Sequence, residues 1–506
     1  MAEPSLQAAS QPGNQLAALD LGSNSFHLLV AQESNGRIQV VDKIKDMVRL
    51  AEGLDAAEHL SEPVAQRALA SLERFGQRLR ELPPHNVRVV ATSTLRRATN
   101  AADFLRRAEA VLGHRVEVIS GREEARLIYQ GVANALEDNS ERRLVVDIGG
   151  GSTELILGRN YTPELMESLH LGCVELSRTH FADGKLRSSR LESAVAQAKQ
   201  ELEPVQRTYR ESGWDSAIGA SGTILAAQEV LRQMGIDQDG ITHSGLRTLG
   251  KRLFEAKSID KISLPGLPAE RAPVFPGGLA ILMAVFEELG IDRMQATSGA
   301  LREGVIHDLL GRAHHQDVRE RTVRDLSERY HIDSRHARCV RETALSLLAQ
   351  VALDWQLTDS NDRLMLGWAA DLHEIGFDIA HNQYHKHGGY LLEHMDMPGF
   401  SSWDQRTLAA LVRAHRRKFP MQDGPFAGSH AQRMIRLATL LRLSVLLHRN
   451  RSSTPLPHVG LRASGANLTL VLPGGWLRRH ALTRLDLEQE TAFLAAVPLS
   501  LSVTRV

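Results

Sequence analysis

The feature that most constrains this chain is a short motif that occurs twice, 127 residues apart (147 − 20 = 127). The first copy, DLGSNS, spans Asp20–Ser25, and the second, DIGGGST, spans Asp147–Thr153. In each copy an apolar stretch leads to an aspartate, then to glycine and hydroxyl residues, and then to a second apolar stretch. A repeat spaced by about one domain's length predicts two similar lobes.

Both copies of the motif suit the binding of phosphate and of a metal ion. A glycine-rich turn lets backbone N–H groups converge on an anion, and hydroxyl side chains add donors. An aspartate at a strand end offers oxygen ligands to a divalent cation, directly or through water. We therefore predict Asp20 and Asp147 as metal ligands. The predicted phosphate-binding residues of the two turns are Ser23, Asn24, Ser25, Gly149, Gly150, Gly151, Ser152 and Thr153.

The apolar pattern predicts an α/β protein followed by a helical region. Leu16–Leu19 and a strand ending at Val30 flank the first motif and predict a hairpin. Further strands are expected at Val87–Ala91, Val116–Ile119, Leu144–Val146 and Ala217–Ile218. After about residue 311 the spacing becomes helical, as at Ala344, Leu348, Val351 and Trp355. The alternating Leu468, Leu470 and Leu472 predict a small β-rich or mixed domain at the end.

Length and composition fit a soluble protein of several domains. A chain of 506 residues exceeds what one core usually organises, and 42% apolar with 24% charged residues is ordinary for a globular protein. We expect lobes at 1–137 and 138–310, a helical domain at 311–450 and a small domain at 451–506. The two cysteines, Cys173 and Cys339, are too few for a disulfide framework, which favours a cytoplasmic location. The polar N-terminal stretch up to Gln15 is expected to be a flexible tail.

Two adjacent glutamates receive different roles. Ser120 follows a predicted strand and Glu123 lies three residues later, which is the spacing of a capping box. Glu124 is then free for chemistry, and the helix dipole is expected to favour its ionised form. An ionised carboxylate can accept a proton from an attacking water molecule. We predict Glu124 as the general base.

Other candidates extend this phosphate chemistry. Arg96 is a predicted catalytic phosphate ligand because a guanidinium can bind two phosphate oxygens, whereas its neighbour Arg97 is expected to be the exposed one. Glu154, on the strand after the second motif, is expected to assist Asp147 in holding the metal. A third glycine-rich turn, Ser221, Gly222 and Thr223, precedes a helix and is predicted to bind phosphate at its N-terminus.

A basic run suggests a site for an extended polyanion. Sixty basic and sixty acidic residues balance overall, but nine Lys or Arg residues against one acid, Asp423, fall between Arg413 and Arg451, a local charge of 9 − 1 = +8. Arg416, Arg417 and Lys418 are the residues predicted to hold this polyanion; the alternative is a solvated helix surface. Aromatic residues total only 5% and do not alternate with the basic ones, so nucleic acid is not the expected polymer.

The chain resembles the superfamily of actin, sugar kinases and heat-shock ATPases and, within it, the exopolyphosphatase and guanosine pentaphosphate phosphohydrolase family. The resemblance covers essentially the whole chain. The motifs that carry it, in order, are DLGSNSFH at Asp20–His27, ATSTLRRA at Ala91–Ala98, ISGREEARLIYQGV at Ile119–Val132, DIGGGSTEL at Asp147–Leu155, GASGT at Gly219–Thr223 and GALREG at Gly299–Gly304.

This resemblance implies two actin-like lobes, phosphoanhydride hydrolysis by water, and a general base at Glu124. It also implies that the helical region, with DLHEIG around His373 and Glu374 and with His385 and His387 downstream, is a domain of the His-Asp phosphohydrolase type. Glutamate replaces the diagnostic aspartate there. We therefore expect a structural or substrate-holding role for this domain.

The expected activity is removal of terminal phosphate from long inorganic polyphosphate, with Mg²⁺ as cofactor; whether a monovalent cation assists is left open. Two alternatives remain, a guanosine pentaphosphate phosphohydrolase and a non-catalytic polyphosphate-binding regulator. A binder has no need of a base, so Glu124 argues against the last. An ATP-dependent sugar kinase would share the fold but would need a second substrate. We expect a homodimer, cytoplasmic or peripheral at the membrane.

Overall fold

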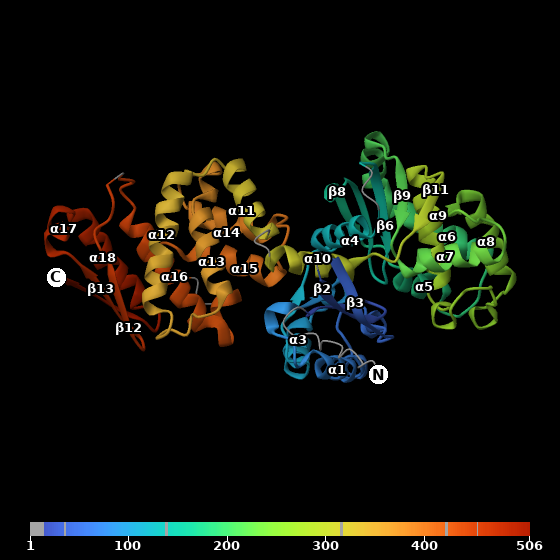
Figure 1. The fold of residues 1–506 in the computed structure, drawn as a ribbon, viewed down its shortest axis with the longest axis horizontal. Coiled ribbons are helices and arrows are strands. Elements are labelled where there is room, and N and C mark those ends of the chain that lie inside the picture. The colour runs from blue at the N-terminus through green and yellow to red at the C-terminus, as the bar shows by residue number, and fades with distance from the viewer. Residues whose placement is uncertain are drawn as a thin grey trace, which may run out of the picture. The chain divides into compact units, whose positions relative to one another are not determined.

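The computed structural model describes residues 15–34, 37–136, 140–313, 317–419, 424–452 and 454–505. The chain forms two compact units that meet in the sequence between Asp317 and Val318 (Figure 1). The predicted division into four domains stays a prediction, and the boundary expected near residue 450 lies within the second compact unit.

The first unit contains two sheets that share the arrangement of five strands, and the second sheet has one more strand, β10, which pairs antiparallel with β11. The first has the order β3-β2-β1-β4-β5, and the second has the order β8-β7-β6-β9-β11-β10. In both sheets three strands pair antiparallel, and two further strands then pair parallel. The parallel pairs are β1 with β4 and β4 with β5 in one sheet, and β6 with β9 and β9 with β11 in the other. This correspondence confirms the duplicated α/β fold. The strands are β1 Gln15–Leu21, β2 Phe26–Ser34, β3 Arg37–Asp46, β4 Val87–Ala91, β5 Val116–Val118, β6 Arg142–Ile148, β7 Thr153–Arg159, β8 Thr162–Leu169, β9 Ser216–Gly219, β10 Ile241–Thr242 and β11 Arg293–Ala296.

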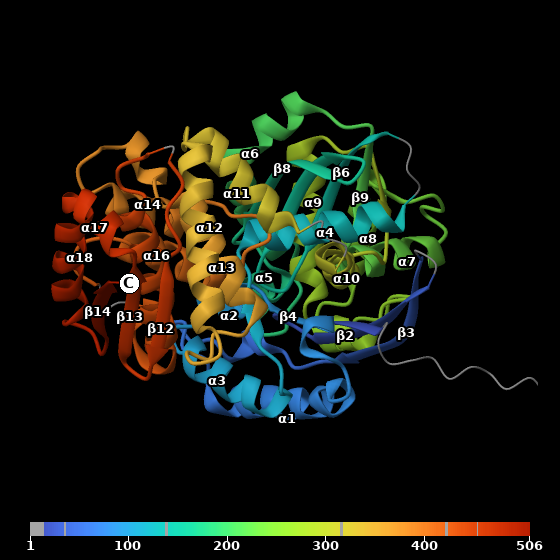
Figure 2. The same cartoon turned by 60° about the vertical axis from the view of Figure 1, so that its left-hand side comes forward.

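Helices cover the outer faces of both sheets. In the first lobe α1 Glu62–Leu79 and α3 Ala101–Leu112 lie together on one side of the sheet, and α2 Ser93–Arg97 follows β4 (Figure 2). The second lobe is built around α9 Phe275–Leu289, which is apolar on nearly all sides and therefore buried. Its other helices are α5 Cys173–Phe181, α6 Ser188–Ser212, α7 Gly222–Gln233 and α8 His243–Glu255.

Two helices, α4 Gly121–Ala135 and α10 Leu301–Ala313, lie between the sheets and share an apolar core with both (Figure 1). Their backbones touch, because a Cβ at Gly131 would lie 2.0 Å from the Ala300 carbonyl oxygen and one at Gly304 would lie 1.8 Å from that of Leu127. Only glycine permits so close an approach. The lobes are thus joined through a tightly packed helix pair.

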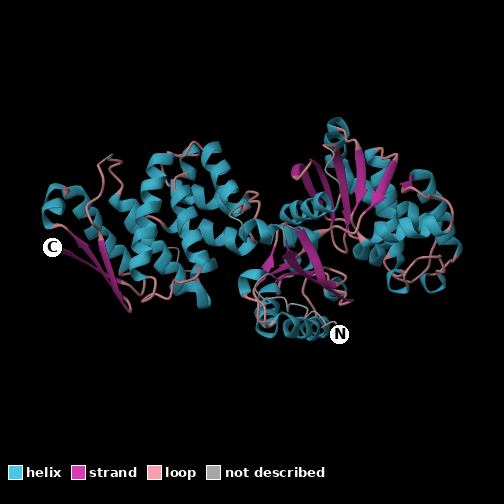
Figure 3. Cartoon of the chain, viewed as in Figure 1, coloured by secondary structure: helices cyan, strands magenta, loops and turns pink. Residues whose placement is uncertain are grey.

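The second unit is helical up to α16 and ends in a small three-stranded sheet of order β12-β13-β14 (Figure 3). One continuous apolar core contains Leu347 and Leu440 of the helices and Leu470 of the sheet. Within the described part of the chain, no helix is both long enough and apolar enough to cross a membrane. The elements are α11 Val318–Arg329, α12 Ser334–Val351, α13 Ser360–Leu372, α14 Tyr384–His394, α15 Ser402–Ala414, α16 Ala431–Leu447, β12 Gly460–Ser464, β13 Asn467–Leu472, α17 Gly474–Arg479, α18 Ala481–Leu494 and β14 Ser500–Arg505.

Candidate active site

All three glycine-rich turns line one cavity of about 260 Å³ in the first unit. Glu124 of α4 and the acidic strand residues open onto the same space. Most residues predicted for metal or phosphate binding therefore lie together. Those in the cavity lining are Asp20, Ser23, Asn24, Ser25, Glu124, Asp147, Gly149, Gly150, Gly151, Ser152, Glu154, Ser221 and Gly222.

The duplicated hairpins explain how the acids reach the cavity. In β1 and in β6 every residue is buried except the first and the sixth, and the sixth is Asp20 in one and Asp147 in the other. Across the antiparallel pairs, Asp20 is opposite His27 and Asp147 is opposite Glu154. Each lobe thus presents a pair of polar side chains at the same end of its sheet.

Burial gives these carboxyl groups unusual protonation behaviour. Burial raises the pKa of Asp20 to about 8, with a contribution from the charges of Glu124 and Asp147, although Arg302 acts in the opposite sense. Burial and the charge of Glu124 raise the pKa of Asp147 to about 7, and the pKa of Glu154 also lies well above its usual range, mainly through burial. Additional positive charge in the cavity would favour their ionised forms.

The carboxylates suit Mg²⁺. Asp20 Oδ1 is buried without a hydrogen-bond partner, so it is an available oxygen ligand. Among the described residues, the cavity acids do not form a group of three whose ligand atoms all lie within 4.8 Å of one another. Mg²⁺ commonly binds one or two carboxylates and completes its octahedron with water and substrate phosphate. The donor set therefore fits Mg²⁺ better than an ion that needs a full cage of protein ligands.

Glu124 lies in the first turn of α4, where the Ser120 hydroxyl accepts a hydrogen bond from the Glu123 amide (3.1 Å). Burial raises the pKa of Glu124, and this outweighs the opposing effect of Arg96, whose Nη1 lies 3.2 Å from Glu124 Oε2. The sequence predicted that the helix dipole favours the ionised form of Glu124, whereas the net shift of its pKa is in the opposite direction because burial outweighs the favourable charges. A raised pKa makes the ionised group a stronger base.

Arg96 contacts Glu124 and the end of the strand that precedes α4. Its Nη1 also donates to the Ile119 carbonyl oxygen (2.8 Å), and Arg96 is not in the cavity lining. Its role as a phosphate ligand stays a prediction. Arg97, expected to be the exposed neighbour, is only half-buried like Arg96: it pairs with Glu58 (2.9 Å) and Glu175 (2.8 Å), and the two arginine side chains are about equally exposed (25% and 24%).

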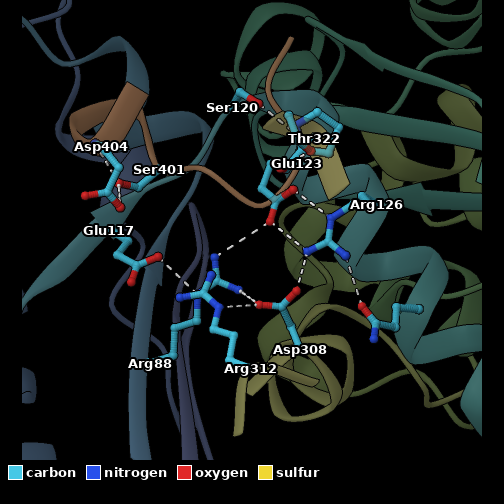
Figure 4. Close-up of polar contacts among 12 residues, drawn as sticks. Arg88, Glu117, Ser120, Glu123, Arg126, Asp308, Arg312, Thr322, Ser401 and Asp404 are labelled. Carbon is cyan, nitrogen blue, oxygen red and sulfur yellow. Dashed lines mark hydrogen bonds and ion pairs between the residues drawn. The ribbon is translucent and has the colours of Figure 1, made fainter. Parts of the chain in front are cut away.

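A buried network of charges fixes α4 (Figure 4). Glu123 accepts hydrogen bonds from Arg126 Nε (2.8 Å) and Nη2 (2.9 Å) and lies 3.7 Å from Arg88 Nη2. Asp308 of α10 completes the network by pairing with Arg88 (2.7 Å) and Arg126 (2.6 Å). Glu123 thus has the structural role that its spacing predicted. The other members, which extend the network at its edges, are Glu117 on Arg88 and Arg312 on Asp308.

Two predicted phosphate ligands lie outside the cavity lining. Thr153 is fully buried and its hydroxyl donates to the Leu171 carbonyl oxygen. Successive strand residues point to opposite faces, so Thr153 turns away when Glu154 faces the cavity. Thr223 is also buried, and its hydroxyl is hydrogen-bonded to the Cys173 thiol. The hydroxyl groups of both threonines are thus engaged within the protein, and a role of Thr153 and Thr223 in phosphate binding stays a prediction.

The basic residues of the lining, His27, Arg271 and Arg302, were not predicted as site residues. Arg302 Nη1 donates to His27 Nδ1 (2.8 Å), so the ring's proton is on Nε2, which donates to the Ser25 hydroxyl (2.7 Å). Burial, with help from Arg302, lowers the pKa of His27 to about 3. The repeat contained the signal for His27, since 154 − 27 is again 127. Arg271, which lies against Gly222 of the third turn, had no local signal.

The basic run carries less free charge than its sequence suggests. Arg416 stacks over the Tyr384 ring (4.9 Å), and Arg417 and Lys418 are exposed, while Asp423 lies outside the described residues. The role of Arg416, Arg417 and Lys418 in holding polyphosphate stays a prediction. Four other arginines of the run pair with acids outside it: Arg433 with Asp359 and Asp362, Arg442 with Glu490, Arg449 with Asp486, and Arg451 with Asp333 and Glu374.

Comparison with known proteins identifies a phosphatase family, in agreement with the phosphate chemistry expected of this cavity. Residues 29–313 match the Ppx/GppA phosphatase family, and residues 318–491 match domain III of the Ppx/GppA phosphatases. The chain belongs to the Ppx/GppA phosphatase family. It is therefore a phosphoanhydride hydrolase, as the repeated turns and the resemblance indicated.

Relatives within the Ppx/GppA family extend over nearly the whole chain. The guanosine-5′-triphosphate,3′-diphosphate pyrophosphatase of Aeromonas hydrophila is 44% identical over 480 residues, 94% of this chain and 95% of the relative. The protein of the same name from Vibrio cholerae is 42% identical and covers 96% of both chains.

Solved structures of Ppx/GppA proteins share the fold. The Aquifex aeolicus Ppx/GppA family member aligns with a TM-score of 0.51 at 26% identity over 60% of this chain and 99% of that one. An exopolyphosphatase from Cytophaga hutchinsonii aligns with a TM-score of 0.54 at 24% identity over 58% of this chain and 97% of that one. At such identity the second likeness speaks for the fold alone.

Proposed function

We propose that the protein hydrolyses the terminal phosphoanhydride bond of guanosine pentaphosphate. The observation that carries this proposal is the identity of 42–44% to guanosine-5′-triphosphate,3′-diphosphate pyrophosphatases over 94–96% of the chain. It replaces our first expectation, long polyphosphate, and favours the alternative that the sequence left open.

In the proposed reaction, Glu124 takes a proton from water as the water oxygen bonds to the terminal phosphorus. The bond between this phosphorus and the bridging oxygen breaks, and its electron pair stays on the departing diphosphate end. Arg302 and Arg271 line the cavity and offer guanidinium groups to phosphate oxygens. Mg²⁺, held by Asp20 and Asp147 with help from Glu154, would supply positive charge to the phosphates.

The cavity admits only the reacting end of such a substrate. Its volume of about 260 Å³ is below the roughly 300–1,000 Å³ of pockets that enclose drug-sized ligands. Guanosine pentaphosphate would place its terminal phosphates in the cavity and its nucleoside outside. Discrimination between nucleotide and polymer then depends on residues beyond the lining.

The test is phosphate release with Mg²⁺ from guanosine pentaphosphate, GTP and long polyphosphate, compared as kcat/KM. We expect guanosine pentaphosphate to be the best substrate, and GTP, which lacks the 3′-diphosphate, to be worse. A higher kcat/KM for long polyphosphate would overturn the proposal while leaving phosphoanhydride hydrolysis intact.

Exopolyphosphatase activity is the second candidate, and the exposed Arg417 and Lys418 beside Arg416 favour it. Neutralising all three should raise KM for long polyphosphate and weaken its salt dependence, because fewer counterions are released, but should leave guanosine pentaphosphate turnover unchanged. A variant that neutralises three exposed arginines of the same unit is the matched control: Arg478, Arg479 and Arg484. If the variant without the charges of Arg416, Arg417 and Lys418 kept the parental KM and salt dependence for long polyphosphate, the basic run would be only a solvated surface.

A further inference from the structure

The second unit contains three buried histidines whose rings lie next to one another in a row. His336 lies on α12, His373 follows α13, and His415 follows α15. The ring centres of His336 and His373 are 5.5 Å apart, as are those of His373 and His415. Glu374, also buried, adjoins the first pair.

His336, His373 and Glu374 bring their ligand atoms together. Within the described residues, they are the group of three metal-ligating side chains whose ligand atoms all lie within 4.8 Å of one another. The Nε2 atoms of His336 and His373 lie 3.8 and 3.9 Å from Glu374 Oε1. Ligands bound tetrahedrally to zinc at about 2.0–2.1 Å are about 3.4 Å apart, so each of these two distances need shorten by only roughly half an ångström.

His373 is oriented as a ligand. Its Nδ1 lies 2.7 Å from the Ala370 carbonyl oxygen, which can only accept, so Nδ1 carries the proton and Nε2 carries the lone pair. Metal-bound histidines are commonly fixed by such a second hydrogen bond. The His373 side chain is 0% exposed, and its Nε2 has neither a hydrogen-bond partner in the protein nor access to solvent. A buried polar atom of this kind normally has a partner.

Arg451 supplies positive charge to this group. It donates to Glu374 Oε1 and, at 3.3 Å, to Asp333 Oδ2. Its side chain is 45% exposed, in contrast to the buried ligands, so it can leave Glu374 toward solvent. A guanidinium and a metal ion cannot both bind the same carboxylate oxygen without strong repulsion.

We propose that His336, His373 and Glu374 bind a divalent transition-metal ion of the zinc class, in competition with Arg451 for Glu374. Two imidazoles and one carboxylate suit zinc and its neighbours better than magnesium. The ion would tie α12 to the end of α13 and leave a coordination position for water. This site is separate from the phosphate cavity and does not depend on the proposed substrate.

The experiment measures Zn²⁺ binding to the full chain by equilibrium dialysis, with excess Mg²⁺ to saturate the cavity acids. Every protein, including the reference, carries Cys339→Ser so that this partly exposed thiol does not bind zinc. We expect one tightly bound ion per chain in the reference and its loss in His336→Gln. An unchanged stoichiometry in a folded His336→Gln protein would overturn the proposal.

Two arginine variants test the competition without altering a ligand. Arg451→Gln should tighten Zn²⁺ binding by about tenfold or more, because it removes a positive charge at the site. Arg449→Gln, which instead releases Asp486, is the matched control and should bind as the reference does. Equal affinity of the two variants would overturn the competition. If His336→Gln fails to fold, Co²⁺ titration of the reference decides, because the visible absorption of nitrogen-bound Co²⁺ should appear in it and its absence would refute the site.

Discussion

Glu123 and Glu124 are adjacent in α4, but their replacement by glutamine should have opposite consequences. Glu123, Arg88 and Arg126 have side chains no more than 9% exposed, and Glu123 accepts two hydrogen bonds from Arg126. Removing one partner of a buried pair costs roughly 3–5 kcal/mol. Both arginines keep Asp308, so we expect about 3 kcal/mol for Glu123→Gln. That loss lowers the urea concentration at the unfolding midpoint, but the variant still folds, because the free energy of unfolding of domains is about 5–15 kcal/mol.

Glu124→Gln should instead keep the midpoint and lose the chemistry. Glutamine matches glutamate in size, and Arg96 keeps the Ile119 carbonyl oxygen. Loss of a general base lowers turnover by roughly 10²–10⁴-fold. Urea unfolding followed by circular dichroism gives the stability, and phosphate release per folded molecule gives the turnover. The assignment of Glu124 as the base and Glu123 as the structural residue would be refuted if Glu124→Gln kept the parental turnover while Glu123→Gln lost turnover without losing stability.

Three further predictions concern the acids and the helix contact. Without divalent metal, the contribution of Asp20 to the free energy of unfolding should fall as pH rises from about 4 to about 8, because its pKa is about 8 when folded but ordinarily 3.8. In urea unfolding with EDTA, the stability of Asp20→Asn should therefore depend less steeply on pH in that window than the stability of the parent protein. Identical slopes would contradict this prediction. Asp147→Asn should raise the Mg²⁺ concentration for half-maximal activity and Glu154→Gln should do so more mildly, whereas two parental titrations would move the metal elsewhere. Gly131→Ala should lower the melting temperature strongly because its Cβ would meet the Ala300 oxygen at 2.0 Å, while Gly475→Ala, with nothing within 4 Å, should not.

Local sequence was a good guide wherever backbone geometry determined the outcome. The repeated turns and the strand Val87–Ala91 could be located because glycine, aspartate and apolar alternation act over a few residues. Contacts between distant residues had no such signal. Arg271 reaches the third turn from a separate segment, and the acid that neutralises Arg442 is Glu490, 48 residues away. Counting charges along the chain therefore overstated the unpaired positive charge of the basic run. For the same reason Arg97 was expected to be exposed.

The duplication places Asp20 in one lobe and Asp147 in the other, and the second turn packs against the first, with a Cβ on Gly150 falling 2.9 Å from that of Ser23. A lobe on its own would not face the aspartate of its counterpart, and the charge of Asp147 is part of what raises the pKa of Asp20. Repulsion between the aspartates therefore opposes the packing of the two turns above about pH 8, where both carboxyl groups ionise. A cation that bound both aspartates would remove this repulsion, so its binding and the packing of the two lobes against each other would favour one another.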